Sequence, residues 1–176
     1  MKKDSKSFEI ALSAIACAFA AAFLMLGSVV PFMLAAGYVV GAFAVMIPLS
    51  KNFIRGALLC YAAAGLLAVW LNPVNVIPYA VFFGLHPIVN FLQKKYVKGK
   101  ALQPVCLLVK AIWFDFSMWL SYFVLKKFSG LVFPEILEQY FYLALFIGGT
   151  LFFIAYDYMI FRCQSSADAI IRRLRR

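Results

Sequence analysis

The chain has 176 residues, of which 65% are hydrophobic and only 14% are charged. A soluble domain carries about a quarter of its residues as charged side chains, so this composition excludes a soluble globular protein and predicts an all-α integral membrane protein. The net charge of +10 is divided among several short segments, which does not favour a nucleic-acid-binding surface.

Six transmembrane helices are predicted from apolar runs whose lengths approach the roughly 20 residues that cross the hydrocarbon of a bilayer. In chain order they cover residues 8–26, 32–49, 56–71, 76–92, 103–125 and 140–161. The short polar link SKNFIR joins the second and third spans into a tight hairpin, and the turn NPVN follows the third. One helical bundle accounts for the whole length, so residues 1–176 are expected to form a single domain.

The positions of lysine and arginine indicate how the bundle is oriented. With the N-terminus in the cytoplasm, 14 of the 17 basic residues lie on cytoplasmic edges, as the positive-inside rule requires. They are Lys2, Lys3, Lys6, Lys51, Arg55, Lys94, Lys95, Lys98, Lys100, Arg162, Arg172, Arg173, Arg175 and Arg176. We therefore expect a plasma-membrane protein with both termini in the cytoplasm. The start MKKDSKSF also resembles a signal peptide, but the apolar run behind it is long for one, so we interpret that run as the first span.

The chain lacks the sequence motifs of common enzymes and metal sites. It contains no G-x-x-x-x-G-K-[ST] and no H-E-x-x-H, and its single histidine cannot build a multi-histidine metal site. No pair among the four cysteines has metal-ligand spacing. We expect no enzymatic activity, no metal and no cofactor.

The first span carries small residues at helical spacing. Ala14, Ala18 and Ala22 recur every four residues in ALSAIACAFAAAF, and Ala16 and Ala20 do the same. In lipid, small residues at this spacing let two helix backbones approach closely. The stripe Ala14–Ala18–Ala22 is therefore either a packing surface inside the chain's own bundle or an interface for a partner helix.

In its layout the chain resembles the substrate-binding S component of an energy-coupling-factor (ECF) transporter. Six spans, cytoplasmic termini, a first helix with alanine every fourth residue and no ATPase motif carry the resemblance, and only Ala14, Ala18 and Ala22 match a motif. The resemblance implies uptake of a vitamin or similar micronutrient in the bacterial inner membrane. It also implies a coupling transmembrane subunit that contacts these alanines, two ATPases, and a small-molecule site that opens outward under the loop at 27–31.

Two other functions stay open. The layout is also similar to that of the rod-shape protein MreD, a non-catalytic membrane scaffold, although the chain lacks the glycine-rich, aspartate-ended hairpin of that family. A small secondary carrier would transport its substrate alone, and six short spans without an internal repeat favour it less.

A structural polar cluster is predicted in the cytoplasmic half of the bundle. At 1.5 Å per residue, Lys110 lies about 10 Å into the fifth span and Asp157 about 8 Å from the end of the sixth, so we expect them to form an ion pair. His86, Asn90 and Gln93 form a polar stripe at i, i+4 and i+7 at the same depth on the fourth span, which Pro87 is expected to bend. Because polar groups are costly in the membrane, we interpret the cluster as interhelical hydrogen bonding. An ion relay and a gating role are the alternatives.

The outer half carries the predicted ligand-binding residues. Asp115 lies near the midplane of the fifth span, and Trp119 and Tyr122 follow it at i+4 and i+7 on the same helix face. Glu135 and Glu138 lie in the external segment beyond. Aromatic side chains beside an acid suit a small amphipathic ligand, whereas the alternative for Asp115 is a structural hydrogen bond.

Overall fold

The computed structural model describes residues 6–97, 99, 102–129 and 135–174, and the regular structure of this part is entirely helical. Its elements are α1 (Lys6–Val29), η1 (Pro31–Met33), α2 (Leu34–Leu49), α3 (Ile54–Val69), α4 (Pro73–Pro78), η2 (Tyr79–Phe83), α5 (His86–Tyr96), α6 (Leu102–Ser129) and α7 (Glu135–Leu174). The prediction of an all-α chain is confirmed.

Four helical segments are long and apolar enough to cross a membrane. They are Lys6–Val29, Pro73–Tyr96, Leu102–Phe128 and Phe146–Gln164. α2 and α3 are apolar but have only 16 residues each, roughly 24 Å at 1.5 Å per residue, against about 30 Å of hydrocarbon. Six helical segments are thus present where six spans are predicted, and two of them are shorter than a full crossing.

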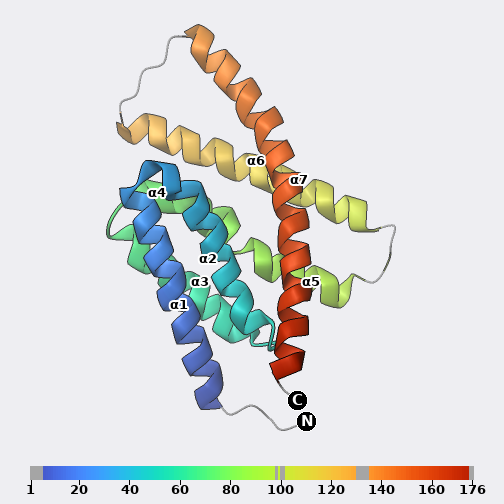
Figure 1. Cartoon of the computed structure of the whole chain (residues 1–176). Coiled ribbons are helices and arrows are strands. Elements are labelled where there is room, and N and C mark those ends of the chain that lie inside the picture. Colours follow the sequence, from blue (N-terminus) through green and yellow to red (C-terminus); the bar gives the residue numbers. More distant parts are fainter. Residues whose placement is uncertain (1–5, 98, 100–101, 130–134, 175–176) are drawn as a thin grey trace.

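The helices form two groups joined by the segment from α4 to α5 (Figure 1). α1 packs against α2 and α3, and α6 packs against α7. The segment α4–η2–α5 touches both groups, because α4 contacts α6 while α5 contacts α2. It is the innermost of the four long segments, with 56% of its apolar window buried against at most 33% for the others.

Two glycines let α1 and α2 approach each other closely near the turn that joins them. A Cβ on Gly37 would lie 2.8 Å from the carbonyl oxygen of Phe23, and one on Gly27 would lie 3.1 Å from that of Met33. The contact at Gly37 leaves no room for a side chain unless the backbone shifts, and the contact at Gly27 is tight. The loop predicted at residues 27–31 is shorter than expected, because α1 continues to Val29 and Gly27 is a buried residue of this helix.

The segment from α4 to α5 is not a regular helix. Asn72 caps it, since its side chain accepts hydrogen bonds from the amides of Val74 and Asn75. A π-helical turn, η2, follows, in which the amide of Gly84 donates to the carbonyl of Tyr79 at 2.9 Å. The irregularity predicted at Pro87 thus lies in the turn before it, where the proline ring prevents regular helical bonding.

The π-helical turn places Phe82 in the centre of the aromatic core. The Phe82 side chain is fully buried, and its ring centroid lies 4.9 Å from that of Trp113, 5.0 Å from that of Phe114 and 5.9 Å from that of Phe153. Since these rings come from α6 and α7, Phe82 packs between the two helices where they cross. His86 follows Phe82 by one helical turn, and its side chain is also fully buried.

Several predicted cytoplasmic edges lie at one end of the fold. Figure 1 shows the beginning of α1, the link from α2 to α3 and the end of α7 at the same end. The ammonium group of Lys51, in that link, lies 5.9 Å from the ring centre of Phe8 in α1. This arrangement fits an even number of crossings, and the orientation with both termini inside stays a prediction.

Cysteine labelling at the two ends of Pro73–Tyr96 tests that orientation. We expect Leu71→Cys to react with a membrane-impermeant maleimide in intact cells, and Tyr96→Cys to react only after permeabilisation. Both side chains are more than half exposed, so the reagent reaches them once it is on the correct side. The unsubstituted chain measures the background from its four free cysteines. Labelling of Tyr96→Cys in intact cells would contradict the orientation.

Candidate functional site

The structure brings His86, Asn90, Lys110 and Asp157 into one hydrogen-bonded cluster. Oδ1 of Asp157 accepts from Lys110 Nζ at 2.6 Å, from His86 Nε2 at 2.9 Å and from Asn90 Nδ2 at 3.2 Å. Lys110 Nζ also donates to Asn90 Oδ1 at 2.8 Å. The expected ion pair between Lys110 and Asp157 is therefore present, and the polar stripe of the fourth span is bonded to it.

The cluster is buried at the junction of α5, α6 and α7. His86, Asn90 and Lys110 are at most 5% exposed, and the Asp157 side chain is 15% exposed. A charge removed from water needs an opposite charge and satisfied hydrogen bonds, or its desolvation makes the fold less stable. Lys110 and Asp157 supply the opposite charges, and the Asn90 amide is bonded to both. Among the described residues, Asp157 Oδ2 and His86 Nδ1 have no hydrogen-bond partner.

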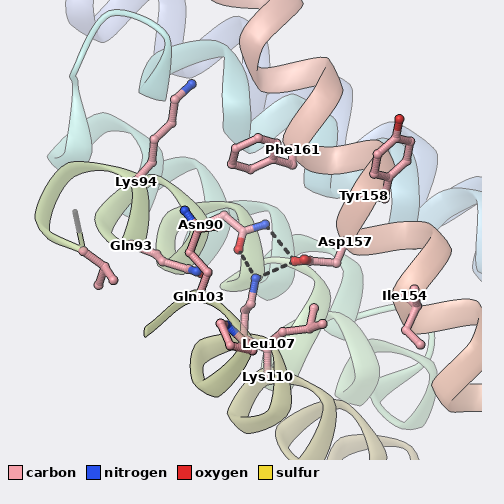
Figure 2. A pocket seen from close by; sticks show the side chains of 12 residues that line it. Asn90, Gln93, Lys94, Gln103, Leu107, Lys110, Ile154, Asp157, Tyr158 and Phe161 are labelled. Carbon is pink, nitrogen blue, oxygen red and sulfur yellow. Dashed lines mark hydrogen bonds and ion pairs between the residues drawn. The ribbon is translucent and has the colours of Figure 1, made fainter. Parts of the chain in front are cut away.

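A cavity of about 560 Å³ lies beside the cluster (Figure 2). Its lining comes from three helix faces and includes Asn90, Gln93, Lys94, Gln103, Leu107, Lys110, Ile154, Asp157, Tyr158 and Phe161. Within each helix these residues follow spacings of three or four, so three faces converge on one space. The volume falls in the range of roughly 300–1,000 Å³ that small-molecule pockets occupy.

Several cavity residues could not be assigned from sequence. Gln103, Leu107 and Lys110 share one face of α6, and Ile154, Asp157, Tyr158 and Phe161 share one face of α7. The i, i+4, i+7 spacing of Gln103, Leu107 and Lys110 predicts that they share one helix face. It does not reveal which helix lies opposite, so the cavity itself appears only in the tertiary structure.

The residues predicted to bind a ligand in the outer half are not part of this cavity. Thr150 Oγ1 lies 3.3–3.4 Å from the Asp115 carboxylate oxygens, but its one hydroxyl proton has a shorter bond, of 2.7 Å, to the carbonyl oxygen of Phe146. Asp115 therefore has only a long hydroxyl contact, and both interpretations of this residue stay open. The Trp119 ring stacks on Phe123 at 5.7 Å and is 39% exposed, while Tyr122 is buried. Glu135 and Glu138 lie in the first turns of α7, and their side chains are outside the described part.

The two alanine series of α1 face opposite ways. Ala14, Ala18 and Ala22 are exposed, whereas Ala16 and Ala20 are completely buried. Packing within the chain's own bundle therefore involves Ala16 and Ala20, and the described helices leave the stripe Ala14–Ala18–Ala22 uncovered.

The chain was compared with protein-family models, curated proteins and solved structures, and none of them matches it.

Proposed function

We propose that the chain is the membrane-embedded small-molecule-binding subunit of an ECF-type uptake transporter, without ATPase activity of its own. The observation that carries the proposal is the exposed alanine stripe Ala14–Ala18–Ala22 on α1. In lipid, a ridge of small residues gives close backbone contact to a partner helix. Ala16 and Ala20, which are fully buried, already supply the contact with the chain's own helices, so the exposed series is left for another subunit.

The cavity between α5, α6 and α7 supports the small-molecule part of the proposal, although it lies in the half predicted to be cytoplasmic and not under the 27–31 segment, where the resemblance places the site. It combines apolar walls with a few convergent polar groups, which is the usual composition of a ligand site. A coupling transmembrane subunit and two ATPases complete the proposed transporter. Native mass spectrometry of the chain, purified gently from its membrane, is the direct test, and a bound small molecule together with these subunits is expected.

Exposed and buried alanines of the same helix provide a matched test of the partner surface. We expect Ala18→Leu to keep its melting temperature in detergent but to lose co-purifying subunits, because the added bulk holds the partner helix away. Ala20→Leu is expected to lower the free energy of unfolding by about 1–3 kcal/mol, since it overpacks the core. If Ala18→Leu keeps all its partners, the stripe is a plain lipid-facing surface and the proposal fails.

A small secondary carrier is the second candidate. The buried Lys110–Asp157 pair beside a cavity favours it, because ionisable groups inside a membrane often mark transport pathways. Transport by the purified chain alone in proteoliposomes would support the carrier and contradict the dependence on ATPases.

A further inference from the structure

Lys110 and Asp157, which we call the floor of the cavity, have hydrogen-bonding groups that no described residue uses. Asp157 accepts three hydrogen bonds, all on Oδ1, and among the described residues none donates to Oδ2. An ammonium group has three N–H donors, of which Lys110 uses two, for Asn90 and Asp157. One acceptor and one donor therefore remain side by side on groups that line the cavity.

The floor carries no net charge to attract an ion. Lys110 and Asp157 neutralise each other at 2.6 Å. Lys94 is a cavity residue, but Figure 2 shows its side chain pointing away from the cluster, and its ammonium group lies 5.7 Å from the ring centre of Phe161. A carboxylate placed on the floor would meet Asp157, and an amine would meet Lys110. Beside the Lys110–Asp157 pair, the electrostatics thus favour a neutral group.

The remaining lining combines apolar and amide side chains. Leu107, Ile154 and Phe161 give apolar walls, and the amide side chains of Gln93 and Gln103 also line the cavity. Neither amide side chain is hydrogen-bonded to another described residue, so both can serve a ligand as donor and acceptor.

We propose that this cavity binds a neutral heterocycle through a lactam edge, that is, a ring carbonyl next to a ring N–H. The carbonyl oxygen accepts from Lys110 Nζ, the N–H donates to Asp157 Oδ2, and the ring lies against Leu107, Ile154 and Phe161. The inference deepens the proposed function and rests on its claim that the chain binds a small molecule. It places the molecule in the half of the bundle that holds the polar cluster, away from Asp115.

Lumazine, a fluorescent bicyclic lactam, and 1,3-dimethyllumazine form a matched pair of probes. The dimethyl compound keeps both carbonyls and the ring but has lost its N–H donors. We expect the purified chain in detergent to bind lumazine saturably with Kd below about 1 mM. The dimethyl compound should bind at least about tenfold more weakly, because it would cover Asp157 Oδ2 without donating a hydrogen bond to it. No saturable lumazine binding, or equal binding of both probes, would overturn the proposal.

A pair of α6 variants tests the location. Leu107→Trp fills the cavity, whereas Leu108→Trp adds the same bulk at an exposed position that does not line it. Lumazine affinity is expected to fall at least about tenfold in Leu107→Trp and to stay unchanged in Leu108→Trp, while both keep the melting temperature of the unsubstituted chain. Equal affinity of the two variants would place the binding elsewhere and contradict the inference.

The failure of this inference and the failure of the proposed function give different results. If a small molecule co-purifies with the chain and Leu107→Trp retains it, the proposed function survives and the cavity assignment is wrong. If the chain co-purifies with neither a small molecule nor other subunits, the proposed function fails. Lumazine binding that depends on Leu107 and on the ring N–H would then still establish the cavity as a ligand site.

Discussion

Asp157→Asn is expected to lower the free energy of unfolding by about 3–5 kcal/mol, the usual loss when one partner of a buried ion pair is removed. The substitution keeps an oxygen that can accept hydrogen bonds but removes the charge opposite Lys110, whose side chain is 7% exposed. The ammonium group then stays in the bundle without a counter-ion. Denaturant titration and thermal melting in detergent measure the loss.

A second substitution separates charge from packing. Adding Lys110→Met to Asp157→Asn removes the uncompensated ammonium, so more than half of the lost stability should return. Asp115→Asn is the matched control on α6, because among the described residues the Asp115 carboxylate has only a long contact, of 3.3–3.4 Å, with the Thr150 hydroxyl. The same hydroxyl bonds the Phe146 carbonyl at 2.7 Å, so the substitution should cost at most about 1 kcal/mol. A double variant no more stable than Asp157→Asn would mean that the ion pair does not stabilise the fold.

Gly37→Leu is expected to cost about 3 kcal/mol or more, at the upper end of overpacking effects. The new Cβ would lie 2.8 Å from the carbonyl oxygen of Phe23, and a backbone oxygen cannot rotate away as a side chain can. The helices α1 and α2 would have to separate along their whole contact. A lower melting temperature in detergent, with lower yield of folded protein, is the expected measurement.

Gly148→Leu is the control for the loss of glycine itself. Gly148 lies in the interior of α7 and is exposed, and a Cβ there meets nothing within 4 Å. Replacing a helical glycine removes a cost of about 1 kcal/mol in backbone entropy, so this variant should be as stable as the unsubstituted chain or slightly more stable. If both leucine variants lose the same stability, close packing of α1 on α2 is not the cause.

Depth along the helices could be predicted from sequence because the rise per residue is constant. Counting residues places Lys110 and Asp157 at similar distances from the same end of the bundle, and the structure has them 2.6 Å apart. His86 and Asn90 follow from the same count. The direction in which Asp115 faces could not be obtained in this way. Its nearest polar partner, Thr150, lies on a helix whose rotation about its own axis the count does not determine.

The sequence by itself predicted an all-α chain, the approximate positions of its six helical segments and the Lys110–Asp157 pair, because apolar runs and the depth of each polar residue depend only on chain order. The tertiary structure alone decided which alanine series of α1 is covered, that Gly37 meets the backbone of α1, and that three helix faces enclose a cavity beside Asp157. The physical reason is that helices in lipid are apolar on every side. Their composition therefore does not distinguish the packed face from the lipid-facing one, and only the close contacts between helices do.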